Sequence, residues 1–174
     1  MKKKFTVSVF SEKQADMLNR IGIVLNRRNL VVESITASES ELKHVHRYTL
    51  VVQADRREVD KIALQIEKIT DVLKVFIHED AELILQEIAL YKMAVGPLYS
   101  LDVEKIVREY NARILALTTE YMVLEKTGHK EETQALYERL ANFGLLEFAR
   151  SGSVAISKPM KELSVYLKEL QEDF

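Results

Sequence analysis

The chain has 174 residues, of which 47% are hydrophobic and 30% charged, and its formal net charge is -2. This composition suffices for one or two buried cores, and the even mixture of acidic and basic residues argues against a nucleic-acid-binding protein, which needs a basic patch to neutralise phosphates. The absence of cysteine excludes disulfides and thiolate chemistry.

The sequence shows neither a membrane segment nor a secretory signal. No apolar run approaches the roughly 20 residues that a membrane-spanning helix needs. The basic start, residues 1–4, leads directly into a strand pattern and is not followed by the apolar core of a signal peptide. We therefore expect a cytoplasmic protein that does not enter a membrane.

The first half alternates between strand and helix periodicity. Phe5, Val7 and Val9 recur every second residue, as in a strand, whereas Met17 and Ile21 belong to an apolar helix face. The predicted elements are a strand at 5–10, a helix from about 16 to 29, a hairpin of strands at 31–37 and 48–54, a helix at 57–70 and a strand at 72–78.

The second half repeats this order of elements. It comprises a strand at 83–94, a break at Gly96 and Pro97, a helix at 102–110, a hairpin of strands at 113–118 and 121–125, a helix at 130–142, and an extended segment at 145–157 interrupted at Gly152. Gly144 occupies the position of a helix C-terminal glycine. An amphipathic helix, residues 158–174, is predicted to end the chain with an apolar stripe of Met160, Leu163, Leu167 and Leu170.

This duplicated β-α-β-β-α-β order predicts an α+β fold with two ferredoxin-like domains in tandem, residues 1–79 and 80–174. Each antiparallel four-stranded sheet would carry both helices on one face and leave the other face uncovered. Small units of this kind usually hide that face, or their edge strands, by pairing. We therefore expect a homodimer.

No set of residues indicates a catalytic or metal centre. His44 and His46 would share one face of a strand, and Glu41 or Asp55 would complete a zinc or iron site, but the pair is better explained as solvated residues flanking a turn. The glycine-rich phosphate loop and the nucleophile motif of hydrolases are absent. The chain is therefore expected to have no catalytic residues and not to be an enzyme by itself.

Two other segments carry functional interpretations. The loop at 11–15 opens directly onto a helix N-terminus, whose unpaired N–H groups can hold a small carboxylate. Arg150, Ser151 and Gly152 interrupt a late strand. That interruption is explained either by a β-bulge or strand-end turn, or by a contact surface for a partner protein.

Several short segments, in this order and spacing, resemble the small regulatory subunit of acetolactate synthase (acetohydroxyacid synthase), an ACT-domain family. The resemblance covers nearly the whole chain. The segments are Leu18-Asn19-Arg20-Ile21, Arg27-Arg28, Val32-Glu33-Ser34-Ile35, His46-Arg47-Tyr48-Thr49, Val72-Leu73-Lys74-Val75, residues 86–92 (QEIALYK) and Ala149-Arg150-Ser151-Gly152.

The resemblance implies that residues 1–79 are an ACT domain for effector binding and dimerisation. It also implies a non-catalytic chain that activates a separate large catalytic subunit and confers feedback inhibition by a branched-chain amino acid, usually valine. Thiamine diphosphate, Mg²⁺ and FAD would then be bound by the large subunit, and this chain would bind no cofactor. The alternative is a stand-alone ACT-type amino-acid sensor without an acetolactate synthase partner.

The family also implies an effector site at the interface of paired ACT domains. Its candidate residues here are Lys13, Gln14, Ala15, Asp16, Met17, Leu18, Val31 and Val32. Lys13 and Asp16 replace an asparagine and a glycine of the family pattern, and Val31 replaces an asparagine. Asp16 would cap the helix amides itself and repel an incoming carboxylate. We therefore expect valine binding to be weak or absent.

Overall fold

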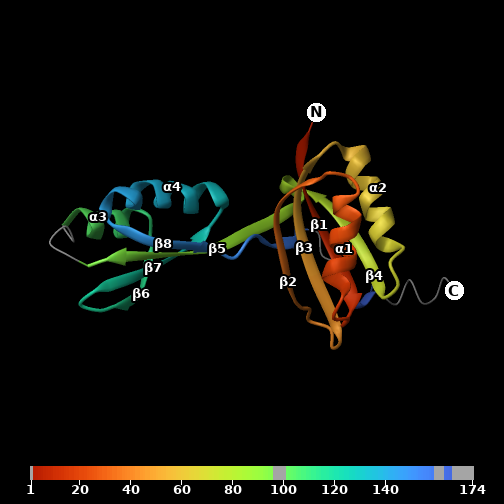
Figure 1. Ribbon diagram of the computed structural model, residues 1–174, viewed down its shortest axis with the longest axis horizontal. Helices are drawn as coiled ribbons and strands as arrows, with labels where there is room; N and C mark the ends of the chain where they lie inside the picture. Colours follow the sequence, from red (N-terminus) through yellow and green to blue (C-terminus); the bar gives the residue numbers. More distant parts are fainter. Residues whose placement is uncertain (1, 96–100, 159–162, 166–174) are drawn as a thin grey trace. The chain divides into compact units, whose positions relative to one another are not determined.

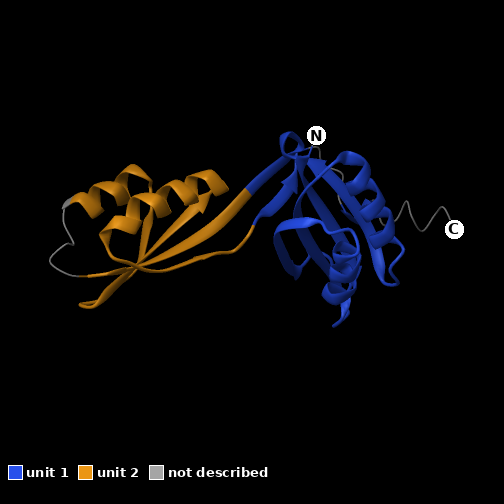
Figure 2. Cartoon of the chain, turned by 45° about the horizontal axis from the view of Figure 1, so that its top comes forward, with its two compact units in different colours: residues 1–85, 153–174 blue, residues 86–152 orange. Residues whose placement is uncertain are grey.

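The computed structural model describes residues 2–95, 101–158 and 163–165, which form two compact units (Figures 1 and 2). One unit comprises residues 1–85 and 153–174, and the other comprises residues 86–152. The expected break at Gly96 and Pro97 lies outside the described residues, as does most of the predicted terminal helix, including Met160, Leu167 and Leu170. None of the helices in the described ranges has the length and apolar character that crossing a bilayer requires.

The first unit has the predicted order of elements. These are β1 (Lys3–Glu12), α1 (Met17–Asn26), β2 (Val31–Glu39), β3 (Val45–Ala54), α2 (Arg56–Glu67) and β4 (Val72–Glu79). The strands pair antiparallel in the order β2-β3-β1-β4, which is the order of a ferredoxin-like sheet. Helix α1 ends earlier than predicted, because Asn29 has a φ of 49° and so cannot continue a right-handed helix.

An apolar layer joins both helices to one face of this sheet (Figure 1). From β1 it receives Phe5, Val7 and Val9, as the alternation predicts. The helix side is formed by residues three or four positions apart: Met17, Ile21 and Leu25 of α1, and Val59, Ile62 and Ile66 of α2. Burial of each such side chain contributes about 1.5–3 kcal/mol, so this layer supplies most of the stability of the unit.

The opposite face of this sheet was expected to be uncovered, and that prediction was wrong. The chain covers part of it with two of its own segments, residues 83–85 and 153–158, which we call the return ribbon, and Leu163 packs on Phe10 and Val45 of the same face. Lys158 N–H donates to the Glu82 carbonyl oxygen at 2.9 Å and so joins the two segments, and Leu83, Leu85 and Ala155 form a buried cluster between them. The sequence analysis treated the halves as closed, whereas the chain re-enters the first unit at residue 153.

The second unit repeats the fold, as predicted. Its elements, with those that flank it, are η1 (Asp80–Glu82), β5 (Leu83–Ala94), α3 (Leu101–Glu109), β6 (Arg113–Leu117), β7 (Tyr121–Gly128), α4 (Lys130–Leu140), η2 (Ala141–Phe143), β8 (Leu145–Arg150) and β9 (Val154–Ser157). The sheet order is β6-β7-β5-β8, and β9 also pairs with β5. Tyr91 and Met93 of β5 pack with Leu124 of β7 and with Leu136 and Leu140 of α4.

The compact units divide the chain differently from the predicted domains, 1–79 and 80–174, which describe the repeat in the sequence. Strand β5 begins in the first unit and continues in the second, and the segment after residue 152 returns to the first. The extended stretch predicted at 145–157 consists of two strands, β8 and β9. Gly152 separates them with a φ of 76°, a backbone conformation that glycine adopts without a steric penalty.

Gly144 and Gly22 provide opposite tests of this backbone. Gly144 has a φ of 79° after η2, so Gly144→Ala should destabilise the protein by about 1–2 kcal/mol. Gly22 lies within α1 and has open space around it, so Gly22→Ala should stabilise by about 0.5–1 kcal/mol. Urea denaturation of both variants measures the two changes. Equal signs for the two changes would contradict the assigned backbone conformations.

Candidate functional site

The loop between β1 and α1 lies at one end of the first sheet. Lys13 N–H donates to the carbonyl oxygen of His44 at 3.0 Å, which places the loop beside the turn between β2 and β3. The exposed candidates in this segment are Lys13, Gln14, Ala15, Asp16 and Leu18. Met17, in contrast, is fully buried in the apolar layer. Met17 therefore anchors the start of α1 and is not accessible to a ligand.

Asp16 directly precedes α1, but its carboxylate makes no capping hydrogen bond to the helix. It accepts a hydrogen bond from Nε of Arg20 at 2.7 Å, and Arg20 Nη1 also lies 3.4 Å from a carboxylate oxygen of Asp71. The expectation that Asp16 caps the helix amides is wrong, because the arginine one turn along the same helix binds its carboxylate. The negative charge still lies beside the N-terminus of α1.

The side chain of Lys13 is also engaged within the chain. Its ammonium group donates to a carboxylate oxygen of Glu39, the last residue of β2, at 3.0 Å. The hydrogen bond from Lys13 and the positive charge of its ammonium group lower the pKa of Glu39 below its usual value, and the charge of His46 adds a smaller effect. A carboxylate ligand would therefore have to compete with Glu39 for this cation.

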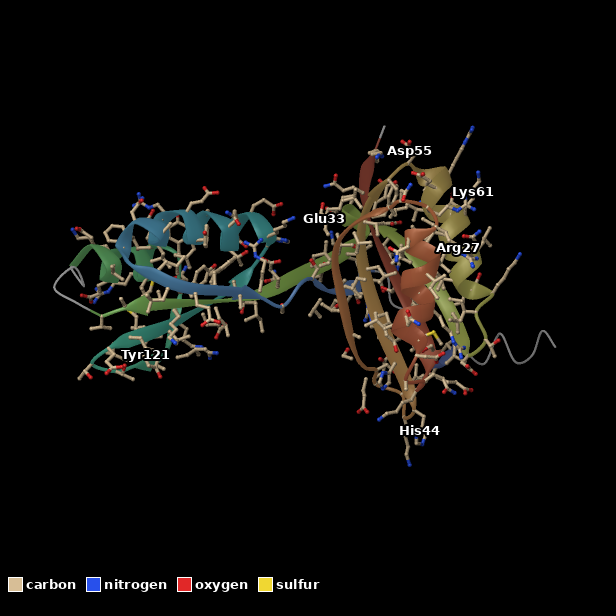
Figure 3. The ribbon with its side chains drawn as sticks, viewed as in Figure 1. Arg27, Glu33, His44, Asp55, Lys61 and Tyr121 are labelled. Carbon is tan, nitrogen blue, oxygen red and sulfur yellow. The ribbon has the colours of Figure 1, made fainter. Side chains whose placement is uncertain are left out.

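Val31 and Val32 lie at the other end of the same sheet. Val32 pairs with Val52, which pairs with Phe5, whereas the loop follows Glu12. The seven residue steps along β1 from Phe5 to Glu12 span about 23 Å at roughly 3.3 Å per residue. Figure 3 shows the same separation, with His44 at the loop end and Glu33 and Asp55 at the opposite end. One chain therefore gathers residues 13–18 but does not bring Val31 and Val32 to them.

A depression of about 430 Å³ lies beside Lys13 at the turn between β2 and β3. Its lining is largely polar: Lys13, Glu39, Ser40, Glu41, Leu42, Lys43, His44, Val45 and His46. The sequence analysis treated most of this segment as a plain turn. The depression can be recognised from the pairing of Glu39 with His46 across the hairpin. That pairing is known only when the strand register is known.

The zinc or iron alternative fails on geometry. Asp55 lies at the opposite end of the sheet from His44 (Figure 3), so it cannot complete a site with the histidines. Within the described ranges, no group of three or more histidine, aspartate or glutamate side chains is placed to hold a metal ion. His44 has a φ of 66° and forms the tight turn that leads into β3.

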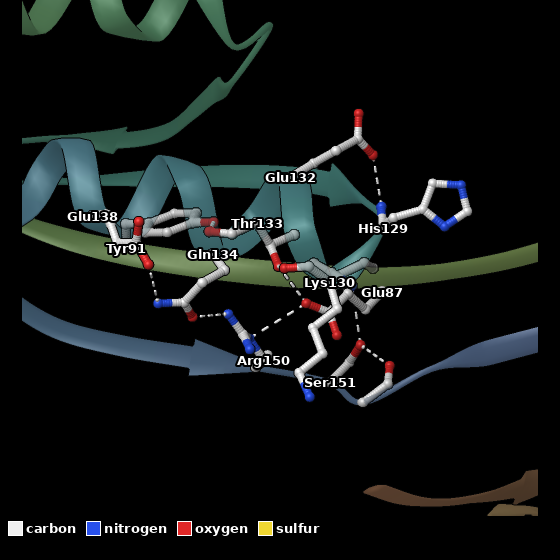
Figure 4. Close-up of polar contacts among 12 residues, drawn as sticks. Glu87, Tyr91, His129, Lys130, Glu132, Thr133, Gln134, Glu138, Arg150 and Ser151 are labelled. Carbon is white, nitrogen blue, oxygen red and sulfur yellow. Dashed lines mark hydrogen bonds and ion pairs between the residues drawn. The ribbon is translucent and has the colours of Figure 1, made fainter. Parts of the chain in front are cut away.

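The second unit contains a buried polar cluster that joins β5, β8 and α4 (Figure 4). Glu87 is only 4% exposed. One of its carboxylate oxygens lies 3.3 Å from Nε of Arg150 and accepts a hydrogen bond from the hydroxyl of Thr133. Arg150 also donates to the side-chain carbonyl of Gln134 at 2.8 Å, and the hydroxyl of Tyr91 donates to the backbone carbonyl of Thr133 at 2.7 Å. Burial raises the pKa of Tyr91, so its phenol stays protonated and can donate.

This cluster supports one of the two interpretations of the interrupted strand. Strand β8 ends at Arg150, and Ser151 N–H donates to the carbonyl oxygen of Ile88, while Ile88 N–H donates to the hydroxyl of Ser151. The segment is therefore a strand-end turn with a structural ion pair beneath it. Glu87 was not singled out in the sequence, because a glutamate at an inward position of a strand can be recognised only when its partner is known.

Removal of Arg150 leaves the carboxylate of Glu87 buried without a countercharge. Arg150→Met should therefore destabilise the protein by about 3–5 kcal/mol. In the double variant Glu87→Gln, Arg150→Met, much of this loss should be recovered, because no buried charge remains unpaired. Urea denaturation of the two single variants and the double variant measures the coupling. Additive effects would show that the ion pair does not stabilise the unit.

Comparison with known proteins agrees with this architecture. Residues 13–75 match the family model of the ACT domain, and residues 86–159 match that of the small subunit of acetolactate synthase. The chain is 30% identical to the acetolactate synthase small subunit of Mycobacterium bovis over 156 residues, which cover 90% of this chain and 93% of the relative. It is also 30% identical to the small subunit of Bacillus subtilis over 159 residues, or 91% of both chains.

A solved structure extends the agreement to the fold. The small subunit of acetolactate synthase from Thermotoga maritima superimposes with a TM-score of 0.84 at 23% identity, covering 91% of this chain and 99% of that one. Two family models in sequence order and relatives matched over nearly their full length lead to one conclusion: this chain belongs to the acetolactate synthase small-subunit family.

Proposed function

We propose that this chain is the regulatory, non-catalytic subunit of an acetolactate synthase, and that it activates a large thiamine-diphosphate-dependent subunit and places it under feedback control by branched-chain amino acids. The observation that supports this proposal most directly is that an ACT domain at 13–75 is followed by the small-subunit domain at 86–159. A stand-alone amino-acid sensor would have no use for this second domain. Thiamine diphosphate, Mg²⁺ and FAD would be held by the large subunit, and the complex would work in the cytoplasm.

The effector site would be completed by a second copy of the chain. Strand β2 is an edge of its sheet, and Val31 and Ile35 on it are 60% and 40% exposed. Antiparallel pairing of two β2 strands about Ile35 would place the partner's Val31 opposite Glu39, next to Lys13. A homodimer would thus bring together the two groups of candidate residues that one chain keeps apart, and it would also satisfy the unpaired backbone groups of the edge.

The charges at this site favour weak valine binding. Asp16 and Glu39 supply two carboxylates near the path of a ligand carboxylate, and Lys13 and Arg20 are already paired with them. A like charge at about 4 Å costs about 1 kcal/mol in water and several at lower effective dielectric. Val31 offers no amide to the polar groups of an amino acid. We therefore propose that valine is a poor effector here.

Restoration of the family residues tests this account of the site. The triple variant Lys13→Asn, Asp16→Gly, Val31→Asn should bind valine at least tenfold more tightly than the natural chain, a gain of about 1.4 kcal/mol, because it removes one carboxylate and restores two amides. Isothermal titration calorimetry measures the affinity. Tight valine binding by the natural chain, or no gain in the triple variant, would contradict the proposal.

The control for this titration is the double variant Lys3→Asn, Asp60→Asn. It removes an exposed cation paired with Glu79 and an exposed aspartate paired with Arg56 in the same ACT domain, but neither residue belongs to the site. This variant should bind valine as the natural chain does. A gain in the control would assign the effect to general charge and not to the site.

The regulatory function itself is tested by an activity assay of the large subunit with and without this chain. We expect a severalfold rise in acetolactate synthesis on addition of the chain, and inhibition of the stimulated activity by at least one of valine, leucine and isoleucine. Co-purification of the two subunits is the supporting measurement. Unchanged activity together with no association would favour the stand-alone sensor.

A further inference from the structure

The return ribbon contains both chain connections between the compact units. The chain leaves the first unit after residue 85 and re-enters it at residue 153, and these two positions are the ends of the ribbon segments 83–85 and 153–158. Any change in the attachment of the ribbon to the ACT sheet therefore acts on both connections at once. Figure 2 shows these segments as part of the first unit, coloured with the ACT sheet.

The ribbon rests on a partly polar sheet face. The helix side of β1 presents Phe5, Val7 and Val9, whereas its other side presents Thr6 and Ser8, both buried, followed by Phe10, which packs in a small apolar cluster with Val45 and Leu163. Within the described ranges, the hydroxyl oxygen of Thr6 has no hydrogen-bond partner. A buried polar layer with incomplete hydrogen bonding holds two surfaces together less strongly than an apolar layer, because its groups regain their hydrogen bonds in water.

Arg47 of β3 is the main attachment of the ribbon. Its Nη2 donates to the carbonyl oxygen of Ala155 at 2.5 Å and lies 3.4 Å from the hydroxyl of Ser8, and its guanidinium carbon lies 5.4 Å from the centre of the Phe10 ring. Among the described residues no carboxylate forms an ion pair with it, and its Nε has no partner. Burial lowers the pKa of Arg47. The cost of keeping this cation away from water offsets part of what its hydrogen bond to the ribbon contributes, so the attachment is a weak one.

A second attachment lies on the edge strand. The hydroxyl of Thr36 in β2 donates to the carbonyl oxygen of Ser153 at 3.1 Å. Arg47 lies close to the depression at the turn between β2 and β3, because it directly follows His46, one of the residues that line it. Glu41, another residue of that lining, is the acid whose charge acts on Arg47. A ligand or partner that rearranges this turn would change the surroundings of Arg47 directly.

We propose that the return ribbon is a releasable strap on the ACT sheet, closed by Arg47 and Thr36, and that its opening transmits regulation between the two units. In the closed state the strap covers the polar sheet face. In the open state this face and Arg47 are hydrated, and both connections are free. The regulatory part of this proposal rests on the proposed function, whereas the opening itself is a property of the chain alone.

Hydrogen exchange of the isolated chain tests the opening. An isolated two-stranded ribbon is marginally stable, so the amides of 154–158 should exchange at least tenfold faster than those of the central strand β1, through an opening smaller than global unfolding. Arg47→Met should raise the exchange of 154–158 by about a further tenfold, the effect of one hydrogen bond to a charged group, and Arg47→Lys should recover part of the protection.

The matched control is Arg56→Met. Arg56 belongs to α2 and lies 5.9 Å from the ring of Phe5, which faces the helix side of the sheet, so this variant should leave the exchange of 154–158 unchanged. Equal protection of the ribbon and β1 in the natural chain would overturn the proposal, since the ribbon would then open only by global unfolding. An equal effect of Arg47→Met and Arg56→Met would overturn the role of Arg47.

A disulfide lock tests the regulatory part. The chain has no cysteine, so Thr36→Cys, Ser153→Cys introduces one bridge between the sheet and the strap. When it is oxidised, the stimulation of the large subunit should fall at least fivefold, and reductant should restore it. The bridge Lys4→Cys, Gln53→Cys, between paired residues of β1 and β3, should have no such effect.

The outcomes separate the two proposals. Equal stimulation by the oxidised and reduced forms of the strap variant would overturn transmission through the strap. Failure of the natural chain to stimulate the large subunit would instead contradict the proposed function, and the exchange measurements would still decide whether the strap opens.

Discussion

Strand β1 is buried on both faces, and the first unit depends on this constraint. Every residue from Phe5 to Ser11 is buried, although Thr6, Ser8 and Ser11 are polar. One face is sealed by apolar side chains from two helices, which need no particular partner and gain from each methylene removed from water. The other face is covered by the return ribbon, whose attachment depends on a few directional hydrogen bonds. The two covering layers therefore differ in how easily they separate.

The candidate effector site shows the same dependence on partners. In one chain the cations and carboxylates around the loop between β1 and α1 are paired with one another, through Lys13 with Glu39 and Asp16 with Arg20. These pairs are exposed and contribute little to stability. Their importance is that they define what a ligand must displace. One chain therefore presents a set of paired charges at this site rather than a preformed apolar cavity, and the second copy that we propose would complete it.

The two units solve the problem of polar groups inside a sheet differently. In the second unit the buried carboxylate of Glu87 has an arginine and a hydroxyl as partners, so this cluster fixes β5, β8 and α4 in one arrangement. In the first unit the buried guanidinium of Arg47 has a carbonyl oxygen and an aromatic ring as partners, but no acidic partner within the part of the chain that the structure describes. A buried charge with a charged partner holds its surroundings in one arrangement, whereas a buried charge without one is the place where a structure opens most readily.

The amino-acid sequence by itself determined the elements and their order, because the periods of two and 3.6 are local properties of the chain: Phe5, Val7 and Val9 identify β1, and Gly144 identifies the end of a helix. The short segments from Leu18 to Gly152 also indicated the family. The polar loop predicted at 11–15 does precede a helix, but its first two residues, Ser11 and Glu12, belong to β1. Only the tertiary structure decided which groups meet. The pairing of Asp16 with Arg20, the distance of Val31 from Lys13 and the partner of Glu87 follow from sheet register and from positions distant in sequence. The return of residues 153–158 to the first unit was equally unpredictable, because nothing in the sequence of a short apolar strand indicates which sheet face it covers.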